Sequence, residues 1–206
     1  MKKIVFAFAL ALFAMAMTAH ESAVKVKFQG AQPAITDFVD AYVAVIDDEN
    51  ADEVCVNESL GAFSYAWSRY RKGLPQEEGT TLTVDKKNGF VRMVWKYEEH
   101  ELRVEMCYWN EADGKHKLFA CSVAYFENSR YSPGQFDGIE FLRYTNSTRM
   151  LTACDDPGFT SQYGTEDGAY VCYNLPQTGK NITVQYWYPN RTVKKTLKWN
   201  GRKFSF

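Results

Sequence analysis

The sequence predicts an α+β fold in which an N-terminal helical hairpin packs on a large antiparallel β-sheet of about nine or ten strands. Apolar residues recur at helical spacing before Gly73, and apolar and polar residues alternate after Gly79. The dipeptides Asn88-Gly89 and Asn200-Gly201 are typical of tight β-hairpin turns. Helices followed by a long series of strands indicate an α+β domain with an antiparallel sheet.

Residues 1–19 have the pattern of a signal peptide. Lys2 and Lys3 precede an apolar run from Ile4 to Met17, and small residues stand before His20. This run is shorter than the ~20 residues that span a bilayer. We therefore expect an exported protein of the periplasm or the extracellular space, with no transmembrane segment after cleavage and with residues 20–206 forming a single α+β domain.

Two amphipathic stripes predict the helical hairpin over residues 34–72. The first stripe follows Pro33, a residue suited to the first turn of a helix. Gly73 and Pro75 end the second stripe. The first comprises Ile35, Phe38, Val39, Tyr42, Val45 and Ile46, and the second Val56, Leu60, Phe63, Trp67 and Tyr70.

The remainder reads as two meanders, over residues 80–126 and 139–206. Strands are expected at 80–87, 90–97, 101–109, 117–126, 139–145, 148–154, 169–175, 180–188, 193–199 and 203–206. The last turn would place Leu197 opposite Phe204. The segments 89–109 and 168–187 can be aligned at an offset of 78–79 residues. This similarity indicates tandem repeats, with chance resemblance between strands as the alternative.

Five cysteines leave two interpretations open. An exported chain can form disulfides, and Cys107–Cys121 and Cys154–Cys172 are the candidate pairs, with Cys55 as the odd thiol. Alternatively, all five are buried small apolar residues.

Composition and motifs argue against several functions. A net charge of −1 is unlike that of a dedicated nucleic-acid binder. There is no Gly-x-Ser-x-Gly motif and no phosphate-binding glycine loop. Carboxylates at both ends of the loop 155–168 suit either Ca²⁺ or solvent, and the spacing matches no calcium loop. We therefore nominate no catalytic residue, no metal ligand and no cofactor.

Aromatic residues make up 16% of the chain and supply the candidate ligand-binding residues. Adjacent rings on a strand point to opposite faces, so one ring of each pair can face a ligand. The alternative is that these rings fill the two covered faces of a sheet. The candidates are Tyr108, Trp109, Tyr186, Trp187 and Tyr188.

These observations together predict a non-catalytic binding or interaction protein. Its ligand would be an unidentified protein or carbohydrate, bound on a sheet face or on the loops 127–138 and 155–168. One alternative is an extracytoplasmic hydrolase of glycans or peptides whose carboxylates converge only in the fold. Another is a structural subunit of a surface assembly, which would present an apolar patch or an open sheet edge.

The ends of the chain carry a resemblance. The leader, the helical start and the C-terminal segment Leu197-Lys198-Trp199-Asn200-Gly201-Arg202-Lys203-Phe204 resemble those of small exported proteins of Bacteroidetes-type bacteria. The tandem meanders resemble the two-repeat sheet of β-lactamase-inhibitor-protein-like folds, although the second half lacks a clear helical pair. Neither resemblance assigns a functional residue.

Overall fold

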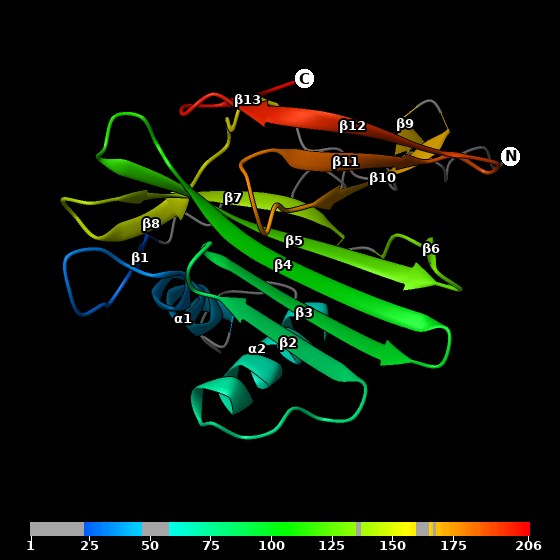
Figure 1. The fold of residues 1–206 in the computed structure, drawn as a ribbon, viewed down its shortest axis with the longest axis horizontal. Helices are drawn as coiled ribbons and strands as arrows, with labels where there is room; N and C mark the ends of the chain where they lie inside the picture. The colour runs from blue at the N-terminus through cyan, green and yellow to red at the C-terminus, as the bar shows by residue number, and fades with distance from the viewer. Residues whose placement is uncertain (1–22, 47–57, 135–136, 160–164, 167) are drawn as a thin grey trace, which may run out of the picture.

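A computed structural model describes residues 23–46, 58–134, 137–159, 165–166 and 168–206 (Figure 1). The expected signal peptide and Cys55 lie outside the described residues. Two helices and thirteen strands are described in chain order: β1 (Val24–Lys25), α1 (Ile35–Ile46), α2 (Glu58–Arg71), β2 (Thr80–Asp85), β3 (Phe90–Tyr97), β4 (His100–Asn110), β5 (His116–Glu127), β6 (Arg130–Tyr131), β7 (Gly138–Thr145), β8 (Met150–Ala153), β9 (Thr165–Glu166), β10 (Ala169–Asn174), β11 (Ile182–Trp187), β12 (Thr192–Trp199) and β13 (Phe204–Ser205).

The strands form two antiparallel sheets, which confirms the α+β class. The large sheet has the order β1-β8-β7-β5-β4-β3-β2, with β6 paired to β5, and the small sheet has the order β13-β12-β11-β10-β9. A single sheet of nine or ten strands was therefore wrong. Local alternation predicts a strand but not its partner, because pairing is decided by contacts far apart in the sequence. Between β8 and β10 the chain leaves the large sheet and begins the small one.

The large sheet is covered on both faces. Figure 1 shows the helices on one side of it and the small sheet on the other. Phe38 and Phe63 of the helices pack on the first face, with Met106 of β4. On the second face, Trp109 and Leu118 pack against residues of the small sheet such as Val184. Because β5 is buried on both faces, its sequence from Leu118 to Phe126 is almost continuously apolar.

The helices lie where the sequence places them, but they are not an N-terminal hairpin. Strand β1 precedes them and pairs with β8, with Val24 opposite Leu151. Two residues are too few to show a period, so the pattern could not reveal this strand. Contacts to Asp40 hold the helices together, through the Trp67 indole at 2.8 Å and Arg71 at 3.1 Å. The connection 47–57 lies outside the described residues.

Two turn predictions need correction. Phe204 lies opposite Trp199, not Leu197, since residues 200–203 form the turn. The Asn88-Gly89 turn is likewise longer than two residues, because Asp85 pairs with Phe90. The Asp85 carboxylate accepts a hydrogen bond from the Asn88 N–H at 3.0 Å, which closes the longer turn.

Strand β10 of the small sheet packs on the face of the large sheet, and polar contacts hold it there. The Ser122 hydroxyl of β5 donates to the Tyr173 carbonyl at 3.0 Å. The Glu105 side chain is 1% exposed, accepts from the Leu175 N–H at 2.7 Å and pairs with Arg92 at 2.7 Å. A buried carboxylate is tolerated when its oxygens are paired in this way. These contacts position the small sheet.

Candidate functional site

The five aromatic residues nominated from the sequence do not share one exposed surface. Trp109 and Tyr186 are core residues between the two sheets, with 4% and 5% of their surfaces exposed. Tyr108 is half-buried on the helix side, where its ring lies 5.2 Å from that of Phe38. Trp187 and Tyr188 are half-buried at the end of β11. On the small sheet, Trp187 and Tyr188 are therefore the nominated residues that stay partly accessible to solvent.

The candidate disulfide pairs are not formed: Cys107, Cys121, Cys154 and Cys172 are free thiols. Cys107 packs between the sheets and Cys121 packs under the helices, so their side chains point to opposite faces. Cys172 packs beside Phe126 and accepts a hydrogen bond from the Trp187 indole at 3.3 Å, whereas Cys154 lies against the core between the sheets. The alternative interpretation, buried apolar cysteines, describes Cys107, Cys121 and Cys172.

The carboxylates of the loop 155–168 are only partly described. Asp156 accepts a hydrogen bond from the Gly158 N–H at 3.0 Å, as a turn residue does. Asp167 lies outside the described residues, as does the middle of the loop.

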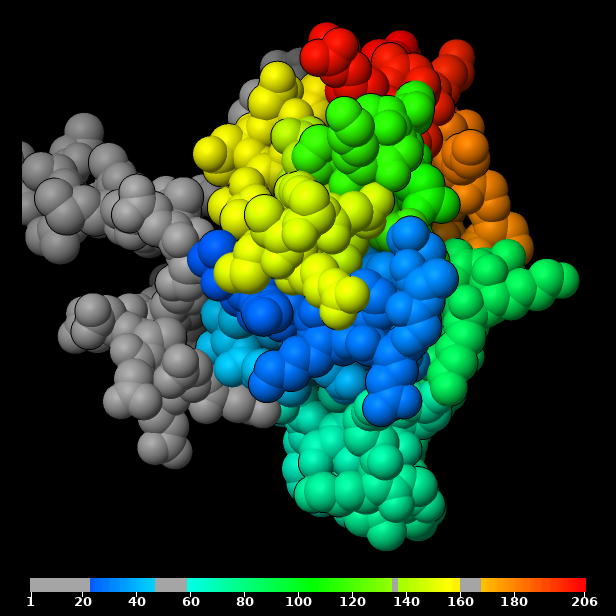
Figure 2. All heavy atoms as spheres, turned by 90° about the vertical axis from the view of Figure 1, so that its left-hand side faces the viewer, coloured from blue at the N-terminus to red at the C-terminus, as the bar shows by residue number. Residues whose placement is uncertain are grey.

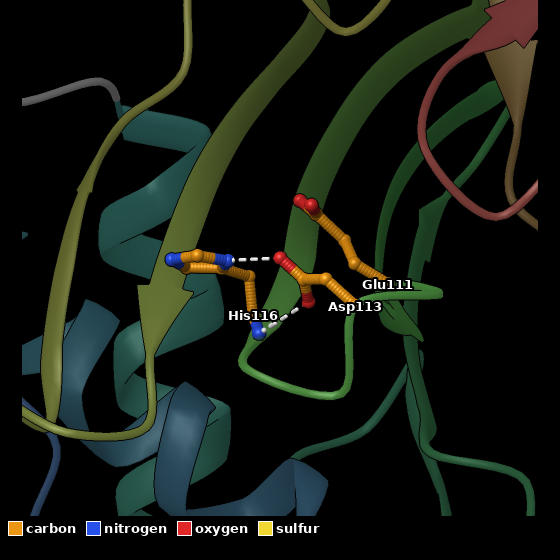
Figure 3. Close-up of side chains that lie close together, drawn as sticks. All are labelled: Glu111, Asp113 and His116. Carbon is orange, nitrogen blue, oxygen red and sulfur yellow. Dashed lines mark hydrogen bonds and ion pairs between the residues drawn. The ribbon is translucent and has the colours of Figure 1, made fainter.

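One group of potential metal ligands lies in the turn between β4 and β5 (Figure 3). One ligand atom from each of Glu111, Asp113 and His116 lies within 4.8 Å of the others. Asp113 contacts the His116 ring at 2.5 Å, and this hydrogen bond is the main cause that lowers the pKa of Asp113 to about 2. Arg143 lies 2.8 Å from Glu111 and already neutralises it. The group therefore acts as a network that stabilises the turn.

Further aromatic residues of the large sheet, exposed or half-buried, lie on its helix side, at the end of β3 and β5 and the start of β4. Trp95 and Tyr97 of β3 point to this face, and their rings are nearly parallel, with centroids 6.2 Å apart and 9° between planes. Cross-strand pairing continues the row through His100 and then through Leu102 to Tyr125. Tyr97 is 58% exposed. We call Tyr65, Trp95, Tyr97, His100 and Tyr125 the aromatic platform.

A shallow pocket of about 210 Å³ lies beside the platform, between α2 and the strands β2 and β3. Its lining is Ala62, Tyr65, Ala66, Gln76, Glu77, Thr80, Met93 and Trp95.

The polar groups of this pocket are held in place by a small network. The Tyr65 ring is 55% exposed, and its hydroxyl donates to Glu77 at 3.1 Å. Arg69 pairs with Glu77 at 2.6 Å and donates to the Tyr65 hydroxyl at 3.1 Å. These contacts fix the ring, and the Arg69 guanidinium lies over one of its faces, 5.7 Å from the ring centre.

Gln76 presents an acceptor with no partner. Its side-chain NH₂ group donates to the Ala66 carbonyl at 3.1 Å, which fixes the amide against α2. Its Oε1 atom is buried and accepts no hydrogen bond within the described part of the chain. An unsatisfied buried acceptor costs free energy, so the fold tolerates a polar defect beside the pocket.

Sequence reasoning missed the platform although two signals point to it. Trp95 and Tyr97 are spaced by two residues on a strand, so both rings share one face. Tyr65 falls between Phe63 and Trp67, off the apolar stripe of its helix, and an aromatic residue off the stripe faces solvent. Trp95, Tyr97, His100 and Tyr125 lie close together because their strands pair in the large sheet. This pairing could be known only from the fold.

No family model, no curated protein and no solved structure matches this chain. Among the described residues, neither helix has the length and apolar character needed to cross a membrane.

Proposed function

We propose that this chain is an exported, non-catalytic binding protein that holds a carbohydrate on the aromatic platform. The observation that carries the proposal is the row of rings Trp95, Tyr97 and His100, which begins at a pocket bordered by Tyr65 and Trp95. Sugars present both apolar C–H faces, which pack on aromatic rings, and hydroxyl groups, which donate hydrogen bonds.

The arrangement suits a sugar better than a compact apolar ligand. The pocket is shallow and continues into an open row of rings along the sheet face, so an extended chain of sugar units could contact several rings. Glu77, Gln76 and Thr80 supply hydrogen-bonding groups at its border. A few polar groups among apolar walls orient a ligand in most binding sites.

The experiment is affinity electrophoresis of the purified protein in native gels that contain xylan, mixed-linkage β-glucan, mannan or dextran. We expect at least one of these polymers to retard the wild type. The Tyr97→Ala variant should bind it about tenfold more weakly, because one exposed ring is worth roughly 1–3 kcal/mol in comparable stacking contacts.

Tyr170→Ala is the matched control. Tyr170 is also an exposed tyrosine, 44% exposed, but it lies on the small sheet, so its removal should leave retardation unchanged. Wild-type mobility that no polymer changes would contradict the proposal, as would equal losses in both variants. Release of reducing ends from the retarding polymer would favour the hydrolase alternative instead.

A further inference from the structure

The C-terminal part of the chain has a charge unlike the rest. Over the whole sequence, 24 basic residues nearly balance 25 acidic ones. From Gly168 to Phe206, however, there is no Asp or Glu. The same segment, which builds the small sheet from β10 onward, contains Lys180, Arg191, Lys194, Lys195, Lys198, Arg202 and Lys203.

Most of these cations are arranged along one strand. Arg191 stands just before β12, three lysines lie within it, and Arg202 and Lys203 follow in the turn to β13. All of them are exposed, and none forms an ion pair with another described residue. We call these six residues the basic strand: Arg191, Lys194, Lys195, Lys198, Arg202 and Lys203.

The rings beside the basic strand support its cations. The Arg191 guanidinium lies 4.7 Å from the centre of the Tyr188 ring. The Lys195 ammonium lies 4.5 Å from the centre of the Tyr186 ring and 5.6 Å from that of Phe206. Cation–π contacts of this kind hold the charged groups in place, and they occupy ring faces that a stacked base would need.

Lysines on an edge strand often serve only to prevent aggregation, and β12 is such a strand. Strand β13 pairs only with Lys198 and Trp199, so among the described strands nothing pairs with the outer edge of residues 192–197. Protection of this edge would explain Lys194 and Lys195. It does not explain the cations in the turns at both ends, nor the absence of acidic residues from the whole segment.

We propose that the basic strand binds a linear acidic polysaccharide along the length of β12. Lys194 and Lys198 share one face of β12, while Lys195 lies on the other face against Tyr186 and Phe206. Cations on the first face and in the turns at its ends complement a polymer with carboxylates at regular intervals, because each contact neutralises one charge and releases counterions. A nucleic acid would also need free rings for its bases, and an anionic membrane is better matched by a broad face than by one strand. In Figure 2 the red C-terminal residues lie at the opposite end of the molecule from the teal helix α2, which carries Tyr65 of the aromatic platform.

The test measures binding of fluorescently labelled polygalacturonate, a linear polymer of carboxylated sugars, by the full-length chain. We expect binding that weakens steeply as salt rises from 50 to 200 mM, as it does for other charge-driven complexes. The double variant Lys194→Gln/Lys198→Gln should bind roughly ten- to thirtyfold more weakly than the wild type. The matched control, Lys86→Gln/Lys87→Gln, removes two exposed lysines from the turn between β2 and β3 and should bind normally.

Several results would overturn this assignment. They are no binding at 50 mM salt, equal losses in the two double variants, and tighter binding to single-stranded DNA or to phosphatidylglycerol vesicles at equal concentrations of anionic groups. The Tyr97→Ala variant should bind polygalacturonate as the wild type does. This comparison separates a failure of the basic strand from a failure of the aromatic platform.

Discussion

At the scale of single residues, Asp137 is the buried carboxylate with the clearest dependence on pH. Its side chain lies beside Tyr131 and accepts the Tyr125 N–H at 2.7 Å, and 4% of the residue is exposed. Burial raises the pKa of Asp137 to about 6, despite hydrogen bonds that lower it. Because the folded protein holds this proton more tightly than the unfolded chain does, the contribution of Asp137 to stability falls as pH rises from about 4 to 6.

We therefore expect the Asp137→Asn variant to lose this part of the pH dependence. From pH 4 to pH 7, the free energy of unfolding of the wild type should fall relative to the variant by on the order of 2 kcal/mol. Urea unfolding at several pH values measures the difference. Parallel pH profiles for the two proteins would contradict this interpretation of Asp137.

The cysteines make a second prediction at this scale. Burial raises the pKa of the Cys107 and Cys121 thiols, and a protonated, buried thiol reacts slowly. In a Cys55→Ser variant prepared without reductant, a thiol reagent should modify all four remaining cysteines after denaturation. Cys107 and Cys121 should react slowly in the native protein. Fewer than four reactive thiols in denaturant would show that a disulfide exists.

At the scale of elements, Gly79 sets how the loop after α2 joins β2 and thus shapes the pocket. Its φ of +76° is in the left-handed region, and an added Cβ would lie 2.3 Å from the Lys96 carbonyl oxygen. The Gly79 carbonyl accepts the Lys96 N–H at 2.9 Å, so the two strands are joined at this point. The backbone here has no room for a side chain.

Gly79→Ala should therefore destabilise the protein by about 2–3 kcal/mol, since it adds a clash to the strain of a positive φ. Gly179→Ala is the control, because Gly179 has a φ of +84° but no atom within 4 Å of an added Cβ. The control should lose only about 1 kcal/mol. Urea denaturation compares them, and equal losses would show that the clash with Lys96 is relieved.

At the scale of the whole molecule, the sequence predicted elements far better than their assembly. The strand over 90–97 has the expected bounds, and the helices occupy their expected segments, because periodicity and capping residues are local. The split into two sheets could not be predicted in this way. It depends on contacts such as that of Ser122 with Tyr173, which are 51 residues apart.

The same limit explains the choice of site residues. Trp95 and Trp109 both lie on strands of the large sheet and look equivalent in the sequence. The small sheet covers Trp109, whose indole donates to the Lys180 carbonyl at 2.8 Å, whereas Trp95 faces the helix side and lines the pocket. The layer that covers each face of the large sheet thus decides which tryptophan ring is accessible to a ligand.

The central claim, that the aromatic platform binds carbohydrate, is tested most directly by NMR of the tryptophan indole N–H signals. The titrant is a hexasaccharide of the polymer that retards the wild type most. We expect the Trp95 signal to shift, while those of the buried Trp109 and Trp199 stay in place. A shift confined to Trp187, on the small sheet, or no shift of Trp95 at saturation, would contradict the claim.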